Sequence, residues 1–343
     1  MMYRTVLAFA PVRRKVRPPW NRALRIAIAV TTIALAALSG PSLASDDFPI
    51  RPIRLVVPYP PGGGIDDVAR LVGQKVAGLL GQPVIIENKP GAGGILGGDA
   101  VARAAPDGYT LLIDNSSLVI NPSLYPKLPF DVARDLAPVT LASTQDSMLL
   151  AHPSLAARTV TELIALAKAR PGKLNYASPR NGSPQHIGME MFNLLAGTQM
   201  VHIPYKGGAP ATNALLAGEV DLLLSGTTGL PHVRSGKARA LATTGGSRSS
   251  LLPDVPTVAE SGLRDYSSTN WQAILVPART PASVVARLNK AFVEALKSPD
   301  IARVLTERNF VVVASTPSEL ARTIEEGLAS YRKLIRETGI KPD

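Results

Sequence analysis

The sequence predicts an α/β protein with two lobes joined by a hinge, in which parallel-rich sheets are covered by helices. Three observations lead to this prediction. From residue 53 onward, short apolar segments alternate with amphipathic helical segments, which is the pattern of strands buried between helices. The 298 residues from Asp46 to Asp343 exceed the usual size of one domain. Several apolar segments lead into loops that precede a helix, as in folds that bind ligands at the ends of parallel strands.

Each element is predicted from apolar periodicity and from the residues that start or stop it. Short apolar runs bounded by turn residues are expected to be strands, and runs with apolar residues at helical spacing are expected to be helices. The predicted strands are 53–57, 84–87, 110–113, 148–151, 174–177, 200–203, 220–224, 238–243 and 273–276. The predicted helices are 66–80, 95–104, 159–168, 184–196, 209–217, 281–296 and 317–338.

The chain is expected to cross between the lobes twice. A single large sheet is possible, but two smaller sheets fit the usual domain size better. We place the crossings near 140–145 and 267–272, so the first domain comprises 46–143 plus 270–343 and the second comprises 144–269. Because open parallel sheets bind ligands beyond the C-terminal ends of their strands, the ligand site is expected between the lobes.

Residues 1–45 are predicted to be a cleaved secretory signal peptide, which places the mature protein in the periplasm. Basic residues precede an apolar run of about 16 residues that begins at Ala23, and small residues follow it before Asp46. The alternative is a membrane anchor, but this run is shorter than the roughly 20 residues that span a bilayer.

The signal peptide also accounts for much of the basic charge. Seven of the 37 Lys and Arg residues lie in it and none of the 26 acidic residues does, so the remaining chain has 30 basic against 26 acidic residues. That part of the chain has no run of basic residues interleaved with aromatic ones. The sequence therefore argues against a nucleic-acid partner.

The residue types present narrow the chemistry further. The chain has no Cys, which excludes disulfides and thiolate chemistry, and its four His are scattered without metal-binding spacing. No G-x-S-x-G motif occurs. We therefore expect no cofactor, no metal site and no catalytic residue.

The most informative segment is the glycine-rich loop after the first predicted strand. Gly62, Gly63 and Gly64 allow the backbone N–H groups at the start of helix 66–80 to approach an anion closely. A side chain at Gly64 is expected to fill the position of a carboxylate. Asp66 is expected to bind backbone N–H groups or ordered water within the loop. The loop lacks the G-x-G-x-x-G and P-loop patterns, which argues against a nucleotide, and a purely structural turn is the alternative.

A second loop of the same kind follows strand 174–177. Ser183 fits an N-cap and Pro184 the first helical position, so two helix N-termini, one per lobe, could hold one carboxylate from both sides. His186 would lie in the first helical turn, where the helix dipole disfavours its cation. It is expected to be a neutral packing or hydrogen-bonding residue, with ligand contact and catalysis as alternatives. Tyr205 could reach the cleft from the next loop or belong to a simple turn.

The residues expected to contact the ligand are Tyr59, Gly63, Gly64, Ile65, Asp66, Ser116, Ser178, Arg180, Asn181, Gly182, Ser183, His186 and Tyr205.

Eight sequence blocks occur in the order found in one known family. They are IRLVVPYPPGGGIDDVAR, VIIENKPGAGG, AAPDGYTLL, NPSLYPKLPFD, NYASPRNGSPQHIGMEMF, HIPYKGGAPATNALLAGEVD, LPDVPTVAESG and NWQAILVPARTP. In this order they resemble the Bug-type extracytoplasmic solute receptors, the substrate-binding proteins of tripartite tricarboxylate transporters. The resemblance covers residues 46–343.

The resemblance implies a two-lobed, type II-like periplasmic-binding-protein fold that closes on a small carboxylated solute. It also implies that backbone amides and ordered water from residues 58–66 and 178–183 hold the carboxylate. The family usually has Thr or Ser where Ile65 stands, so a hydroxyl near the ligand is missing here. It often has Gly where Arg180 stands, and this cation could meet a second carboxylate or point to solvent.

The sequence thus predicts a periplasmic solute-binding protein, not an enzyme, that captures a small carboxylate. The ligand could be a di- or tricarboxylate, an amino acid or an aromatic acid, taken for transport or for sensing. Membrane permease subunits are possible partners, and the protein is expected to be a monomer. Two alternatives stay open: a secreted hydrolase or isomerase that uses His186 with Ser183 or Asp66, and a signalling module gated by its ligand.

Overall fold

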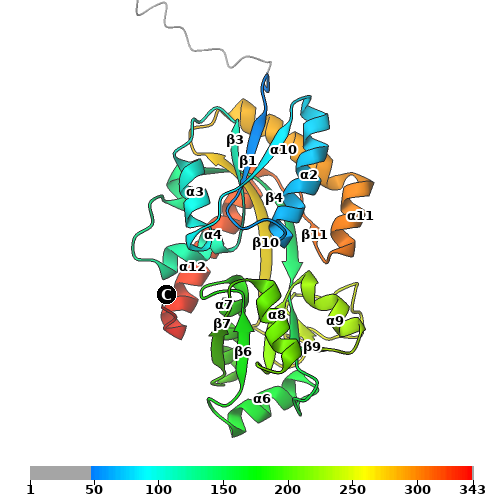
Figure 1. Cartoon of the computed structure of the whole chain (residues 1–343). Helices are drawn as coiled ribbons and strands as arrows, with labels where there is room; N and C mark the ends of the chain where they lie inside the picture. Colours follow the sequence, from blue (N-terminus) through cyan, green and yellow to red (C-terminus); the bar gives the residue numbers. More distant parts are fainter. Residues whose placement is uncertain (1–47, 342–343) are drawn as a thin grey trace, which may run out of the picture. The chain divides into compact units, whose positions relative to one another are not determined.

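A computed structural model of the chain describes residues 48–341, which belong to one compact unit (Figure 1). The predicted signal peptide lies outside the described residues. Across residues 48–341, none of the helices combines the length and hydropathy needed to cross a bilayer.

The first of two sheets, sheet A, has six strands in the order β11-β4-β10-β3-β1-β2. The strands β1, β2 and β3 are parallel to one another, whereas β10 is antiparallel to β3 and β4, and β11 is antiparallel to β4. Their bounds are β1 (Ile53–Val57), β2 (Val84–Asn88), β3 (Thr110–Asn115), β4 (Leu136–Asp146), β10 (Thr269–Pro277) and β11 (Val311–Val312).

The second sheet, sheet B, has five strands in the order β7-β6-β8-β5-β9. The strand β6 is parallel to β7 and β8, and β5 is antiparallel to β8 and β9. Their bounds are β5 (Met148–Ala151), β6 (Asn175–Ser178), β7 (Val201–Pro204), β8 (Leu222–Ser225) and β9 (Arg239–Thr243).

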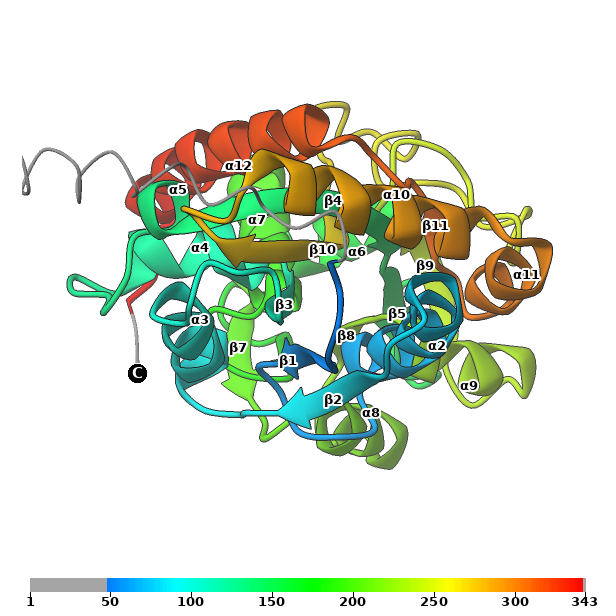
Figure 2. The same cartoon turned by 90° about the horizontal axis from the view of Figure 1, so that it is seen from above.

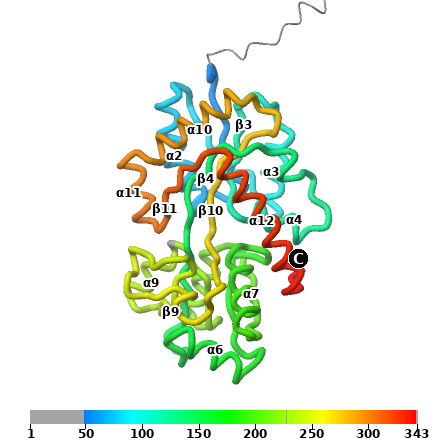
Figure 3. The backbone as a smooth tube through the Cα atoms, turned by 180° about the vertical axis from the view of Figure 1, so that it is seen from behind, coloured from blue at the N-terminus to red at the C-terminus, as the bar shows by residue number. Residues whose placement is uncertain are grey.

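Two adjacent strands carry the chain between the sheets, as Figure 3 shows from behind. The strand β4 ends at Asp146 and β5 begins sheet B at Met148, while β10 brings the chain back at Thr269. The hydroxyl of Thr269 donates to a carboxylate oxygen of Asp146 at 2.7 Å, where the two strands pair. We call sheet A with its helices lobe I, and sheet B with its helices lobe II. The domain borders themselves, predicted after residues 143 and 269, stay a prediction.

The α/β class and the two lobes are confirmed, but the expectation of mainly parallel sheets needs correction. The chain enters lobe I through β10 and lobe II through β5, and each of these strands runs away from the other lobe. The strands β1 and β3 of lobe I, and β6 and β8 of lobe II, run towards the other lobe. A strand entering a lobe from the hinge must therefore lie antiparallel to its neighbours. Alternation of strands and helices along the chain does not reveal this difference.

Helices cover both faces of sheet A. Ile53, Leu55 and Val57 pack with residues of α2, α10 and α11 on one face, and Val56 packs with residues of α3, α4 and α12 on the other. Figure 2 shows α2 and α11 on one side of this sheet and α3 and α4 on the other. The bounds are α2 (Gly64–Leu80), α3 (Ile95–Ala102), α4 (Ser117–Leu124), α5 (Val132–Asp135), α10 (Ala282–Lys297), α11 (Pro299–Glu307) and α12 (Pro317–Thr338).

Lobe II is built in the same way around two further apolar clusters, one on each face of sheet B. A smaller cluster joins the lobes on one side, where Ile120 and Leu124 of α4 meet Ile187 of α7 and Leu334 of α12. The helices of this lobe are α6 (Val160–Ala169), α7 (Pro184–Ala196), α8 (Gly208–Ala217) and α9 (Leu230–Arg234), with the short 3-10 turn η2 (Thr227–Gly229). In lobe I, η1 (Ala92–Gly94) precedes α3.

Candidate ligand-binding site

The loops that follow β2, β3 and β6 come together where the two lobes meet, and Tyr59 in the loop after β1 bonds to Asp114 at the end of β3. A guanidinium nitrogen of Arg180, which follows β6, donates to the carbonyl of Gly93 in η1 at 3.3 Å and to the hydroxyl of Ser117 in α4 at 2.8 Å. An added Cβ on Gly182, also after β6, would lie 2.3 Å from a methyl carbon of Leu124 in α4. The expected meeting of strand ends between the lobes therefore occurs, and it defines the candidate site.

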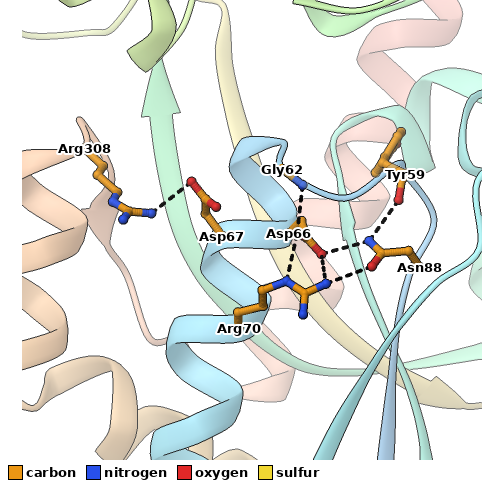
Figure 4. A network of polar contacts seen from close by, with 7 residues as sticks. All are labelled: Tyr59, Gly62, Asp66, Asp67, Arg70, Asn88 and Arg308. Carbon is orange, nitrogen blue, oxygen red and sulfur yellow. Dashed lines mark hydrogen bonds and ion pairs between the residues drawn. The ribbon is translucent and has the colours of Figure 1, made fainter.

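The loop between β1 and α2, residues 58–63, is fixed from behind by Asp66 (Figure 4). The buried carboxylate accepts from the backbone N–H of Gly62 at 2.9 Å, from Nε of Arg70 at 2.9 Å and from the side-chain amide of Asn88 at 2.8 Å. The same amide of Asn88 also donates to the carbonyl of Tyr59 at 3.1 Å. Burial alone would raise the pKa of Asp66, but these hydrogen bonds outweigh it and hold the pKa below its ordinary value. The expected bracing role of Asp66 is confirmed.

The start of α2 presents a row of backbone N–H groups. The helix begins at Gly64, two residues before the predicted start, with Gly63 as an extended N-cap. The N–H of Asp67 makes the first helical bond, to the carbonyl of Gly63, and within residues 48–341 no acceptor is found for the N–H groups of Gly63, Gly64, Ile65 and Asp66. Such a row of donors, combined with the positive end of the helix dipole, suits an anion.

Two expectations about side chains at this loop need correction. An added Cβ on Gly64 would lie 3.4 Å from the ring of Phe310, a core residue, so a side chain there would point into lobe I and not into the carboxylate position. The side chain of Ile65 is also buried in that core. A contact of Ile65 with the ligand would therefore use its backbone N–H. Having Ile instead of Thr or Ser at this position changes the packing of the core and not the lining of the site.

The loop between β6 and α7, residues 179–183, uses the N–H groups of Gly182 and Ser183 internally. The hydroxyl of Ser183 caps α7 by accepting from the N–H of His186, as expected, and the N–H of Ser183 itself bonds to the carbonyl of Arg180 at 3.2 Å. The N–H of Gly182 donates to Nδ1 of His186 at 3.0 Å, and Pro184 has no N–H. This helix start therefore offers an anion far fewer donors than the start of α2.

His186 packs its ring against this loop and accepts a hydrogen bond from Gly182. Its ring stacks on that of His202 with centroids 3.7 Å apart, and Nε2 of His202 lies 2.7 Å from the hydroxyl of Ser178. Because Nδ1 accepts from Gly182, the proton of the neutral ring is on Nε2. Burial, with smaller effects of His202 and the cation of Arg180, lowers the pKa of His186 to about 3, so the ring is neutral. This agrees with the expected neutral hydrogen-bonding role.

The predicted pair of Ser183 and His186 does not resemble a nucleophile with its base. Ser183 contacts the backbone N–H of His186 and not its ring, and the hydroxyl of Ser178 donates to the carbonyl of Arg180 at 2.8 Å. Each hydroxyl is thus committed to holding the loop. Among residues 48–341 there is also no group of three or more His, Cys, Asp or Glu residues placed to hold a metal ion.

Asp114, at the end of β3, is a site residue that the sequence prediction missed. It is 2% exposed, and one carboxylate oxygen accepts from the hydroxyl of Tyr59 at 2.9 Å and from the N–H of Asn115 at 2.7 Å. Burial raises the pKa of Asp114 to about 7 against the opposing effects of these hydrogen bonds and of Arg180. The signal that could have found it is its position as a charged residue directly after the apolar run 110–113.

Burial and the Asp114 carboxylate in turn raise the pKa of Tyr59.

The other predicted residues have structural partners. Ser116 is fully buried and donates its hydroxyl to the side chain of Asn270 in β10. The side-chain amide of Asn181 donates to the carbonyl of Lys341 at 2.8 Å, and Tyr205 lies near Glu219, which follows α8. None of these three side chains is shown to face the start of α2, so their contact with a ligand stays a prediction.

A surface groove of about 640 Å³ lies elsewhere, along residues 313–316 and α12. Its charged lining residues are of both signs, with Lys297 and Arg322 beside Glu319 and Glu326, and Glu319 is used in capping α12. The loops between the lobes remain the better candidate because they combine unpaired donors with a cation.

Comparison with known proteins gives a consistent result. Residues 68–340 match the family described as "Tripartite tricarboxylate transporter family receptor". The chain is similar to Rpa4515 of R. palustris, solved with adipate, at a TM-score of 0.80 and 31% identity over 86% of this chain and 100% of that one. It is similar to MatC of Rhodopseudomonas palustris, solved with bound malate, at a TM-score of 0.76 and 33% identity over 84% and 100%. It is also similar to the periplasmic binding protein BugD, at a TM-score of 0.78 and 31% identity over 86% and 100%. The chain therefore belongs to the tripartite tricarboxylate transporter receptor family.

Proposed function

We propose that the protein captures a small carboxylate between its lobes, with the N-terminus of α2 as the principal carboxylate-binding element. The observation that carries this proposal is the row of four consecutive N–H groups, from Gly63 to Asp66, that have no acceptor in the described part of the chain. A carboxylate can accept several of them at once, and the helix dipole favours its charge. Relatives solved with adipate and malate support the same ligand class.

The protein binds this solute without changing it and delivers it to membrane permease subunits or to a sensor. The commitment of Ser178, Ser183 and His186 to holding the loop supports binding without chemistry. The leader-like sequence of residues 1–45 and the likeness to the periplasmic binding protein BugD support export to the periplasm and removal of the leader. Either destination of the solute fits a receptor that acts as a monomer.

Native mass spectrometry of the protein as purified, followed by calorimetric titration, tests the proposal. We expect either a retained small carboxylic acid or saturable binding of at least one member of a panel of mono-, di- and tricarboxylates and amino acids. The bound acid should be recovered unchanged after long incubation. A folded protein that binds no member of the panel would refute the proposed function, and turnover of the bound acid would favour an enzyme.

A pair of substitutions at Gly64 tests the carboxylate-binding element itself. Gly64→Pro removes one N–H at the first helical position, where proline is well tolerated, and the extended Gly63 has the backbone that precedes a proline. Losing one charge-assisted hydrogen bond should weaken carboxylate binding about 10-fold or more. Gly64→Ala is the matched control, since it adds a Cβ but keeps the N–H. Equal affinities of the two variants would show that this N–H does not contact the ligand.

A further inference from the structure

Arg180 is a partly buried cation without an ion pair at the junction of the lobes. Its guanidinium bonds only to neutral acceptors, which are the carbonyls of Asn181 and Gly93 and the hydroxyl of Ser117. Among residues 48–341, none of the ion pairs closer than 4 Å includes it. Asp114 is close enough to interact with this charge but not to form an ion pair with it. A positive charge withdrawn from water is costly without a paired anion, so this position is suited to an anionic partner.

The guanidinium also has donors to spare. A guanidinium has five N–H groups in a planar fork, and the hydrogen bonds found here use about three of them. Contacts with Gly93 and Ser117 hold the fork against lobe I, although Arg180 itself belongs to lobe II. The fork is therefore pre-positioned between the lobes, and such an arrangement binds a carboxylate at small cost in side-chain entropy.

We propose that the ligand is a dicarboxylate and that Arg180 binds its second carboxylate while the N–H groups of α2 bind the first. This inference rests on the proposed function. It assigns the two lobes different tasks, since α2 serves any carboxylate and Arg180 selects for a second negative charge. Arg180 is thus the specificity-determining residue of this site.

Asp114 sets a condition for this arrangement, because its carboxyl group faces the same region. The titratable or charged groups that face it are Tyr59 from the loop after β1 and Arg180 from the loop after β6. The neighbouring strand β10 presents Ala273, and Gly94 of η1 lies near its second carboxylate oxygen. A dianion requires Asp114 to be protonated, and the raised pKa of about 7 makes this protonation accessible at neutral pH. Protonated Asp114 can then donate a hydrogen bond to the ligand.

The alternative occupant of this region is an ammonium group, which would need ionised Asp114. An amino-acid ligand would then use Asp114 for its amine and would leave Arg180 with a smaller role. The two possibilities predict opposite pH dependence of the ligand affinity, and opposite effects of Asp114→Asn on that affinity. They are therefore separable by the experiment below.

The experiment measures calorimetric affinities of succinate, malate, glutarate and adipate, each beside the monocarboxylate of equal chain length. Variants are Arg180→Gln, Arg180→Lys and Arg264→Gln, the last a control at an exposed arginine of lobe II. We expect the best dicarboxylate to bind at least about 10-fold more tightly than its monocarboxylate. Arg180→Gln should reduce this ratio about 10- to 100-fold, Arg180→Lys should reduce it less, and Arg264→Gln should leave it unchanged.

The control variants keep the result interpretable. Thermal unfolding of each variant establishes that it is folded, and its monocarboxylate affinity establishes that the α2 element is intact. Asp114→Asn should lose the gain in dicarboxylate affinity that the wild-type protein shows on going from about pH 8 to about pH 6.

Three results would overturn the inference. One is a monocarboxylate that binds as tightly as any dicarboxylate. Another is a folded Arg180→Gln or Arg180→Lys variant that loses both ligand classes equally. The third is a requirement for an amine that Asp114→Asn abolishes. In each of these the proposed function survives because a carboxylate still binds, whereas binding of no carboxylate at all would refute both.

Discussion

The two loops that face each other across the lobes have the same local plan and different chemistry. Each follows the C-terminal end of a parallel strand and leads into a long helix, α2 in lobe I and α7 in lobe II. In lobe I the side chain of Asp66 holds the loop from behind and leaves the N–H groups at the helix start without acceptors. In lobe II the ring of His186 and the carbonyl of Arg180 take up the loop's own N–H groups.

This difference shows that a strand–loop–helix unit is not by itself a carboxylate site. What matters is whether the bracing groups bind the loop's N–H groups or leave them available. The loop of lobe II compensates by sending a cation, Arg180, to the other lobe. Backbone donors recognise a carboxylate generally, while a side chain can be gained or lost during evolution and is suited to setting specificity.

Removing the brace of the first loop should have the largest effect. Asp66→Ala removes the acceptor of the Gly62 N–H and one acceptor of the Asn88 amide, and it removes the ion pair of Arg70. We expect the free energy of unfolding to fall by about 2–3 kcal/mol and carboxylate affinity to fall with it, as measured by urea unfolding and calorimetry. Asp67→Ala is the matched control, since the neighbouring Asp67 has only a half-exposed ion pair with Arg308, and its effect should be much smaller. Similar losses in the two variants would contradict the bracing role.

The brace of the second loop should instead show itself through pH. The pKa of His186 is lowered to about 3, so the unfolded chain takes up a proton below its ordinary pKa while the folded protein does not. Stability should therefore fall as the pH decreases from about 6.5, by about 2 kcal/mol at pH 5. In His186→Gln, whose side-chain oxygen can still accept from Gly182, this loss should disappear when urea unfolding is compared at about pH 7.5 and about pH 5. An unchanged pH dependence would argue that His186 is protonated in the folded protein.

The stability contributed by Asp114 should depend on pH in the opposite direction to that of His186, and the change measured should be smaller. Its folded-state pKa is raised to about 7, so the stability that it contributes below its ordinary pKa is lost as the pH rises through that value. Asp114→Asn keeps an acceptor for Tyr59 and removes the ionisation. Relative to the wild-type protein, the variant should gain about 1 kcal/mol of stability as the pH rises from about 4 to about 5. The absence of this gain would mean that the buried carboxylate is favourably paired when ionised.

The sequence predicted elements well where the pattern is local and apolar. The strand β1, the caps of α7 and the long helix α12 were all found, since apolar periodicity, Ser183 and Pro184 act within a few residues of one another. It missed β4, whose buried face contains Thr140 and Ser143. These hydroxyls are satisfied by distant groups, the carbonyl of Ser315 and the side chain of Gln272, so a buried strand has the composition of a surface loop.

By itself, then, the sequence determined the α/β class, the glycine loop at the start of α2, the brace by Asp66 and the family resemblance. Each of these depends on residues that are near in the chain or on short blocks of sequence. Only the tertiary structure decided that β10 lies antiparallel beside β3, that Asp114 is buried, and that Arg180 contacts Gly93 and Ser117 in the other lobe. These facts depend on burial and on contacts between segments far apart in the chain, and the pKa values and charge pairing of a site follow from such contacts.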